Sequence, residues 1–277
     1  MIDFPRAFVI GDPVAHSKSP LIHTRWLQTY GIAGSYEAIH VKPEGLSTFM
    51  ARLRAGEFVG GNVTVPHKVA VMDLCDRLDP DAEAIGAVNT LLRAPDGTIV
   101  GSNTDHYGFL ANLDERAPAW DSIRNRALVL GAGGAARAVV HALARRGYRD
   151  IVILNRTLDK ARELADAFPA RAAGLEDYAA LAPDADFLVN TTTIGMHGTR
   201  FAGLPLEALP PHAVVTDIVY TPLVTPLLAD AERRGLVSVD GLGMLLHQAV
   251  PGFAAWFGKK PAVTPALRSE VIAVMGK

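Results

Sequence analysis

Residues 127–146 read ALVLGAGGAARAVVHALARR, a short apolar run, a glycine-rich turn and then apolar residues at helical spacing. The turn fits the pattern G-x-G-x-x-G/A, which joins a strand to a helix in dinucleotide-binding sheets. Glycine permits the tight turn and lets backbone N–H groups approach a pyrophosphate at the start of the helix. A turn that binds nothing is the alternative, because glycine-rich turns are common in α/β sheets. With strand and helix correctly placed, we predict that a dinucleotide contacts Gly131, Ala132, Gly133, Gly134 and Ala135.

The alternation of strands and helices continues towards the C-terminus. After the expected helix 134–146, stopped by Gly147, a strand at 151–154 precedes a helix lined by apolar residues of 158–168. Further apolar runs predict strands at 187–190, 214–218 and 236–239, and the tail is expected to be helical over 244–257 and 265–275. Strict alternation with short turns is typical of a parallel doubly wound α/β sheet.

The first hundred residues predict a second α/β unit. Strands are expected at 7–10, 36–41 and 60–65, and Pro95-Asp96-Gly97 joins a hairpin of 88–92 and 98–101. One helix is expected to have Ser19 as its cap, Pro20 at its first position and Gly31 past its end. A second follows the spacing of Leu46, Phe49, Met50 and Leu53, and a third opens near His67, with Cys75 on it as a small buried residue.

Composition limits the class of protein. A chain of 277 residues, 49% of them hydrophobic, has material for two cores. A net charge of −2 gives no case for nucleic acid or anionic lipid. The single cysteine, Cys75, excludes an intramolecular disulfide and a cysteine-cluster metal site, and His16, His67, His106 and His247 have no metal-ligand spacing. With neither a signal-peptide pattern nor an 18-residue apolar run, we expect a soluble, cytoplasmic protein.

The end of the second strand of the doubly wound sheet indicates which cofactor binds. Enzymes that use NAD tend to carry an acidic residue there, to bind the ribose 2′-hydroxyl. Here the position reads Asn155-Arg156-Thr157, with Lys160 one turn later. A guanidinium, an ammonium and a hydroxyl suit a 2′-phosphate, so NADP is favoured. The alternative is a solvated arginine and lysine at a helix start.

Short polar side chains gather in the first half of the chain. Asn62-Val63-Thr64-Val65-Pro66-His67-Lys68 is followed by Asn89 and by Asn103-Thr104-Asp105. An amine, a carboxylate and several hydrogen-bonding groups suit proton transfer on a small polyhydroxylated substrate. Taken singly, Lys68 is equally a solvated lysine, and Asn62 and Asn89 equally tie backbone groups in turns.

Seven stretches together resemble the shikimate dehydrogenase family, in the family's order and over nearly the whole chain. They are His16-Ser17-Lys18-Ser19-Pro20, residues 62–68, Ala87-Val88-Asn89-Thr90, Asn103-Thr104-Asp105, the glycine turn, Asn155-Arg156-Thr157 and Gly241-Leu242-Gly243-Met244-Leu245. The resemblance implies reversible reduction of 3-dehydroshikimate to shikimate by NADPH in aromatic amino-acid (chorismate) biosynthesis. It implies a substrate domain of residues 1–105 and 242–277, with the tail returning to it, and a Rossmann-like NADP domain of residues 106–241. Substrate and cofactor would meet between them, in a monomer or homodimer.

The resemblance also implies residue roles. Ser17 and Ser19 match serines that bind the substrate carboxylate, or, on the residues alone, a turn residue and a helix cap. Thr64, Asn89, Tyr220 and Gln248 match further substrate-binding residues, and Thr192, Ile218 and Gly241 lie towards the nicotinamide end. Lys68 and Asp105 match the catalytic pair: an ammonium can protonate a developing alkoxide, and a carboxylate can orient it and bind a substrate hydroxyl.

Departures from the family pattern fall beside the catalytic aspartate. His106 and Tyr107 follow Asp105 where the family usually has glycine first, and Ser102 replaces a frequent acidic or amide residue. These changes affect the expected substrate preference without touching the acid/base pair. Two other classes stay open, an NAD-preferring quinate/shikimate dehydrogenase and a non-catalytic ligand sensor. Non-acidic residues at 155 and 156 argue against the first, and the presence of Lys68 and Asp105 against the second.

Overall fold

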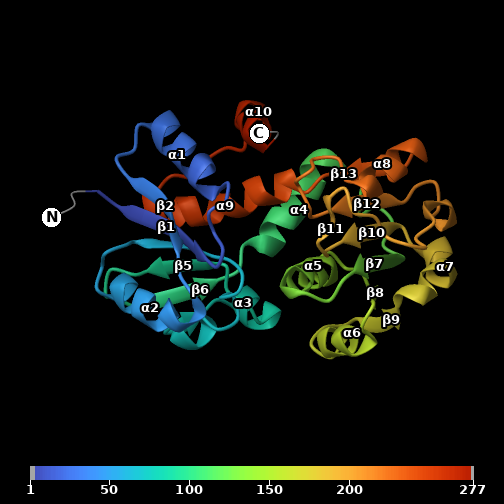
Figure 1. Cartoon of the computed structure of the whole chain (residues 1–277), viewed down its shortest axis with the longest axis horizontal. Coiled ribbons are helices and arrows are strands. Elements are labelled where there is room, and N and C mark those ends of the chain that lie inside the picture. Colours follow the sequence, from blue (N-terminus) through green and yellow to red (C-terminus); the bar gives the residue numbers. More distant parts are fainter. Residues whose placement is uncertain (1–3, 276–277) are drawn as a thin grey trace. The chain divides into compact units, whose positions relative to one another are not determined.

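The computed structural model describes residues 4–275, so the outermost parts of the predicted substrate domain, residues 1–3 and 276–277, lie outside it. The chain divides into two compact units. The first comprises the residues up to 104 together with 248–273, and the second comprises residues 105–247. Each unit is built on its own six-stranded sheet (Figure 1).

The sheet of the first unit is mixed. Its strands lie in the order β2-β1-β3-β5-β6-β4. β1 is parallel to β2 and β3, whereas β5 is antiparallel to both β3 and β6, which confirms the hairpin predicted around residue 96. The strands span β1 Arg6–Gly11, β2 Ser35–His40, β3 Gly60–Val63, β4 Arg77–Leu78, β5 Thr90–Arg93 and β6 Ile99–Ser102.

Aromatic residues fill both sides of this sheet. Phe8 packs edge-on against Phe49 and Phe58, with ring centroids 4.7 and 5.1 Å away. On the other side Trp256 of α9 donates its indole N–H to the backbone oxygen of Leu91 at 2.9 Å, which attaches the C-terminal segment to the sheet. The helices are α1 (Ser19–Tyr30), α2 (Leu46–Arg54), α3 (Pro80–Ile85), the end of α9 (Leu242–Phe257) and α10 (Pro265–Met275).

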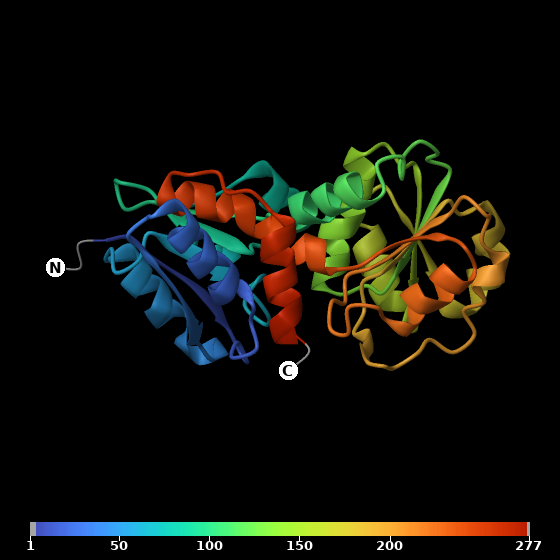
Figure 2. The same cartoon turned by 90° about the horizontal axis from the view of Figure 1, so that it is seen from above.

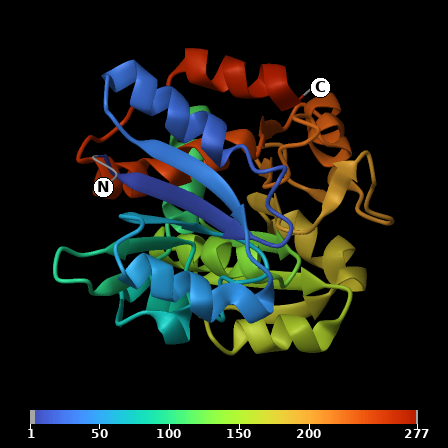
Figure 3. The same cartoon turned by 60° about the vertical axis from the view of Figure 1, so that its left-hand side comes forward.

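Helix α10 lies beside α1, the first helix of the chain (Figure 3). Arg25 of α1 forms an ion pair with Glu270 of α10, and the indole N–H of Trp26 donates to the backbone oxygen of Ala262 at 3.0 Å. The C-terminal helices therefore pack on the first unit, as predicted.

The sheet of the second unit is wholly parallel, as predicted for a doubly wound fold. Its order is β13-β12-β10-β7-β8-β9, and helices cover both faces (Figure 2). The strands span β7 Arg126–Leu130, β8 Asp150–Asn155, β9 Arg171–Gly174, β10 Phe187–Asn190, β12 Val214–Asp217 and β13 Val237–Val239, with β11 (Ile194–His197) outside the sheet. The helices are α4 (Asp105–Arg116), α5 (Gly134–Arg145), α6 (Leu158–Ala165), α7 (Tyr178–Leu181) and α8 (Pro226–Arg233).

The start of α9 packs on α4. A side chain on Gly243 would overlap the carboxamide of Asn112, which would have to move to make room for it. The Asn112 side chain donates to the backbone oxygen of Asp240 at 2.7 Å, just before α9 begins.

The helix predicted near His67 does not form. Residues 65–71 form turns, and only a short 3₁₀ helix (Met72–Leu74) follows, so Cys75 does not lie on an α-helix. The reason is that the backbone oxygen of Lys68 accepts a hydrogen bond from Val88 N at 2.7 Å instead of from the next helical turn. Helices α3 and α4 and strand β9 were not predicted at all.

The cap predicted at Ser19 is also wrong. Lys18 holds the cap position of α1 without a side-chain cap bond, and Ser19 is the first helical residue. The end of the helix is as expected, because Gly31 adopts a left-handed conformation with φ of 60°.

Candidate active site

Asn89 is the centre of a polar network in the first unit. Its Oδ1 accepts hydrogen bonds from Thr90 Oγ1 and from Thr104 N, both at 2.8 Å. Its Nδ2 donates to Thr104 Oγ1 at 3.1 Å and to Gln248 Oε1 at 3.5 Å. The fold thus brings together Asn89 and Gln248, which the sequence singled out from distant parts of the chain.

Asn62 is hydrogen-bonded to residues of this network. Its Oδ1 accepts from the hydroxyl of Tyr36 at 2.7 Å, and its Nδ2 donates to Asn89 O at 3.2 Å and Thr90 Oγ1 at 3.1 Å. Both ends of the amide are therefore used within the protein, which is the scaffold role that sequence left open for it. Tyr36 was not predicted, because a tyrosine on a strand carries no signal of such a role.

The hydroxyl of Tyr36 also links this network to Ser19. Burial raises the pKa of Tyr36 well above its usual value, and a hydrogen bond with the Ser19 side chain opposes that rise. Ser19 is buried, and its backbone N–H donates to Ser17 Oγ at 3.3 Å. The two serines therefore lie together at the start of α1, with Ser17 satisfying one of the free N–H groups of the helix.

Lys68 lies on a turn that is fixed at both ends. The preceding residue, His67, is buried, and its Nε2 lies 2.6 Å from Val41 O. Val88 N holds the backbone oxygen of Lys68 itself. Thr64, at the end of β3, donates its N–H to Ile10 O at 2.9 Å. The backbone that carries Thr64 and Lys68 is thus rigid, as a site for proton transfer requires.

The glycine turn of the second unit leaves room for a ligand. Gly131 has a φ of 102°, and a Cβ there would lie 2.6 Å from Thr192 Cγ2, so only glycine fits. By contrast, a Cβ on Gly133 or Gly134 would meet nothing within 4 Å. Helix α5 has no side-chain cap and no acidic residue in its first turn. An open, uncapped helix N-terminus of this kind fits a pyrophosphate.

The end of β8 carries exposed cations. Asn155 Nδ2 donates to Thr157 O at 2.8 Å. Arg156 and Lys160 are exposed, and within residues 4–275 neither has an ion-pair or hydrogen-bond partner in its side chain. Asp159 lies in the first turn of α6, where it pairs with Arg162 at 3.0 Å. These positions fit a 2′-phosphate better than a free ribose hydroxyl.

Thr192 and Ile218 lie at the carboxyl edge of the same sheet. Thr192 Oγ1 donates to Asn190 Oδ1 at 2.8 Å. A Cβ on Gly241 would lie 2.5 Å from Ile218 O, so these two predicted residues are in contact through their backbones. Tyr220 is half-buried, and burial raises the pKa of its hydroxyl.

Asp105 is the first residue of α4 and is buried. A carboxylate is stabilised at a helix N-terminus by the N–H groups there. It belongs to the second unit, whereas Lys68 belongs to the first.

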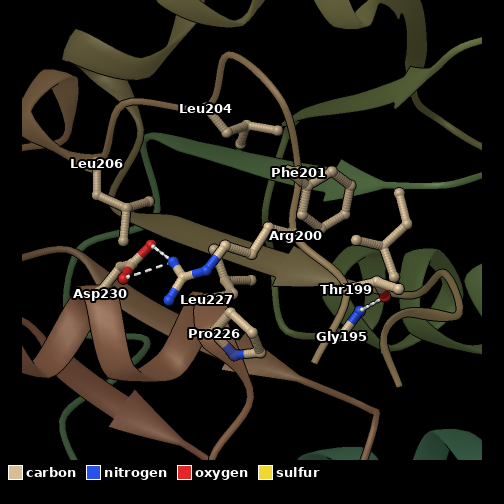
Figure 4. A pocket seen from close by; sticks show the side chains of 10 residues that line it. Gly195, Thr199, Arg200, Phe201, Leu204, Leu206, Pro226, Leu227 and Asp230 are labelled. Carbon is tan, nitrogen blue, oxygen red and sulfur yellow. Dashed lines mark hydrogen bonds and ion pairs between the residues drawn. The ribbon is translucent and has the colours of Figure 1, made fainter. Parts of the chain in front are cut away.

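A small hollow in the second unit contains none of the predicted residues. It lies between the segment after β11 and α8, and Arg200 spans it to Asp230 with bonds of 2.9 and 3.1 Å (Figure 4). Its volume is about 30 Å³. That is room for roughly one water molecule, so it is no substrate pocket.

Two features are absent from residues 4–275. No group of three metal-ligating side chains occurs among them. None of the helices described there is long and apolar enough to cross a membrane.

Most of the chain matches known proteins. Residues 9–91 match the shikimate dehydrogenase substrate binding domain, 115–242 match shikimate / quinate 5-dehydrogenase, and 241–268 match the shikimate 5′-dehydrogenase C-terminal domain. A shikimate dehydrogenase (NADP(+)) of Brucella melitensis is 55% identical over 277 residues, which cover 98% of this chain and 95% of the relative.

Two solved structures are similar in fold. One is shikimate 5-dehydrogenase from Thermus thermophilus in complex with NADP(H) and shikimate, with 39% identity, a TM-score of 0.85, and coverage of 98% of this chain and 99% of the other. The other is quinate dehydrogenase from Corynebacterium glutamicum in complex with NAD, with 29% identity, a TM-score of 0.89, and coverage of 98% and 99%.

Proposed function

The chain belongs to the shikimate dehydrogenase family, and on that premise we propose how its residues carry out the reaction of an NADP-dependent shikimate dehydrogenase. The enzyme is an oxidoreductase that interconverts 3-dehydroshikimate and shikimate, in the biosynthesis of chorismate and the aromatic amino acids. The observation that carries the cofactor assignment is that Arg156 and Lys160, in the same unit as an open glycine turn, are exposed and have no side-chain partner within residues 4–275.

Two functional domains, whose proposed bounds differ by a few residues from those of the two compact units, have separate tasks. Residues 1–105 with 242–277 bind the substrate, and residues 106–241 bind NADP. The polar network around Asn89 supports the first assignment, and the parallel sheet with its glycine turn supports the second.

Substrate recognition rests on short hydroxyl and amide side chains. Ser17 and Ser19 donate their hydroxyl protons to the substrate carboxylate, Ser19 in place of its bond to the Tyr36 hydroxyl. The substrate hydroxyls bind Thr64, Asn89 and Gln248, and Tyr220 is a further substrate-binding residue. Because Asn89 is already held by its neighbours, it is preorganised for this task.

Reduction of the carbonyl needs a hydride on carbon and a proton on oxygen. NADPH, when bound, supplies the hydride. Lys68 donates the proton to the oxygen as negative charge develops there, and in the reverse direction it removes the same proton from the hydroxyl. Asp105 accepts a hydrogen bond from a neighbouring substrate hydroxyl.

Cofactor binding divides among three segments. The pyrophosphate contacts the backbone of Gly131, Ala132, Gly133, Gly134 and Ala135, and the 2′-phosphate contacts Asn155, Arg156, Thr157 and Lys160. Thr192, Ile218 and Gly241 bind the nicotinamide end. We further propose a cytoplasmic monomer or homodimer that engages neither nucleic acid nor membrane.

Product analysis tests the substrate assignment. With NADP, shikimate should be converted to 3-dehydroshikimate far faster than quinate is oxidised. A preference for quinate would instead favour the second candidate, a quinate dehydrogenase. The similarity in fold to the Corynebacterium enzyme is the observation that supports this candidate.

A further inference from the structure

Two buried carboxylates lie on opposite sides of the parallel sheet. One lies where the carboxyl ends of the strands meet (the carboxyl edge), and the other where their amino ends meet (the amino edge). Asp217 ends β12 at the carboxyl edge and is fully buried. Asp186 immediately precedes β10 at the amino edge and is buried as well. Ligands of doubly wound sheets bind at the carboxyl edge, so the two carboxylates differ in their distance from the cofactor site although their surroundings are similar.

Asp217 joins three segments of the carboxyl edge. Its Oδ1 accepts from Asn190 Nδ2 at 2.8 Å and from Val219 N at 2.9 Å, and its Oδ2 accepts from Thr225 Oγ1 at 2.7 Å. All three donors are uncharged, and Thr225 also caps α8. Burial raises the pKa of this carboxyl to about 6, against the opposing effect of the three hydrogen bonds.

Asn190 extends these contacts to the glycine turn. Its Oδ1 accepts from both the N–H and the hydroxyl of Thr192, at 2.9 and 2.8 Å, and its Nδ2 also donates to Ile194 O at 2.7 Å. The methyl group of Thr192 in turn packs where a side chain on Gly131 would lie. An unbroken series of contacts thus leads from Asp217 to the turn.

We propose that Asp217 is a positioning residue for the cofactor, holding the Thr192 loop through Asn190 and the Ile218–Tyr220 segment through Val219. The inference rests on the proposed function, because that function assigns Thr192 and Ile218 to the nicotinamide end. A carboxylate suits the task because it accepts from all three donors at once and adds charge-assisted strength to each bond.

The test compares Asp217→Ala, Asp217→Asn and Asp186→Ala by fluorescence titration with NADPH and by thermal melting. Asp186 is the matched control, since it also accepts three hydrogen bonds, from Asn125 N, Arg126 N and the Tyr148 hydroxyl. Asp217→Ala should raise the Kd for NADPH by about 10-fold or more, because small displacements of binding groups are costly. Asp186→Ala should lower Tm comparably but change the Kd by less than about 2-fold. Asp217→Asn should restore most of the affinity, since its amide oxygen can still accept from Asn190 and Val219 and its NH₂ can donate to Thr225.

Three results would overturn the inference: normal NADPH binding by Asp217→Ala, equal weakening by both alanine variants, or no recovery in Asp217→Asn. If Asp217→Ala does not fold, Thr225→Val removes one donor to the carboxylate at nearly constant shape. A Kd raised by about 3-fold then supports the inference and an unchanged Kd contradicts it. A wild-type protein that binds NADPH without oxidising shikimate would sink the proposed function alone.

Discussion

The polar network of the first unit and the proposed cofactor-binding residues of the second differ in whether their side chains are already bonded within the protein. In the first unit, the side-chain amides of Asn62 and Asn89 form hydrogen bonds with neighbouring protein groups. In the second, Arg156 and Lys160 are exposed and unpaired within residues 4–275, and Gly133 and Gly134 face open space.

Binding and stability should therefore respond differently to substitution in the two regions. A substitution in the buried network removes a hydrogen bond that the folded protein itself needs, so stability and substrate binding should change together. A substitution among the exposed cations should change cofactor binding alone, because little of the fold depends on them.

The largest effect is expected for Lys68 of the first unit, through chemistry rather than binding. Lys68→Ala should lower kcat by roughly 10²–10⁴, as expected for a positioned acid/base group, with little change in the Kd for shikimate. The measurement is steady-state kinetics together with equilibrium binding of shikimate. Lys42→Ala, at an exposed lysine of the same unit, is the control and should be neutral. A Lys68→Ala protein that kept kcat within a few-fold of the original would overturn the assignment.

Acid should destabilise the first unit through His23. This side chain is fully buried, stacks on Tyr36 with ring centroids 4.0 Å apart, and finds no hydrogen-bond partner for either ring nitrogen among residues 4–275. Burial lowers its pKa to about 3. The folded state therefore binds this proton less readily than the unfolded state does, so the stability linked to His23 is complete above pH 6.5 and falls as pH drops towards 3.

Between pH 7 and pH 4 this linkage should cost about 3 kcal/mol, measured by urea unfolding across the pH range. Asp217 of the second unit changes stability in the opposite direction. Because its pKa is raised from 3.8 to about 6, its ionisation lowers the free energy of unfolding fully above about pH 6, and this loss is recovered as pH falls towards 3.8. Comparison with His23→Phe isolates the histidine, because Asp217 titrates in both proteins. If the two proteins lost stability in parallel, His23 would not be the acid-sensitive group.

In the second unit, Arg156→Ala should raise the KM for NADP by about 10- to 100-fold, the value of one lost charge-assisted contact. The KM for NAD and the Tm should barely change, because the guanidinium has no partner within the described residues. Arg162→Ala, on the helix that follows Arg156, is the control, since Arg162 is occupied by Asp159. An equal rise in KM for both cofactors would mean that Arg156 does not read the 2′-phosphate.

The smallest effect is expected when one asparagine from each region is replaced by alanine. Asn62→Ala leaves the buried hydroxyl of Tyr36 without its acceptor, so the free energy of unfolding should fall by about 1–3 kcal/mol. Asn155→Ala removes only a bond to Thr157 O at a partly exposed site and should cost less than about 1 kcal/mol. Equal losses in the two variants, measured by urea unfolding, would contradict the contrast drawn between the regions.

The second unit was the easier of the two to predict from sequence. Its strands are continuous apolar runs such as residues 127–130, and the glycine turn marks the start of α5. The signals for the strands and for the helix boundary therefore lie within short stretches of sequence. Strand β9 was missed because Arg171–Gly174 lies at the sheet edge and carries no such run.

In the first unit, the decisive contacts are distant in sequence. The turn at Lys68 depends on Val41 and Val88, and the network around Asn89 depends on Tyr36 and Gln248. No local pattern can reveal such pairings, which is why a helix was wrongly expected at His67. Helix α3 could have been found, because Asp79 caps it and Pro80 opens it.

The most direct test of the account is the initial rate of shikimate oxidation by the wild-type protein, followed at 340 nm with NADP and with NAD. The exposed cations at the end of β8 predict a kcat/KM for NADP about 10- to 100-fold above that for NAD. Equal rates with the two cofactors, or a preference for NAD, would contradict it.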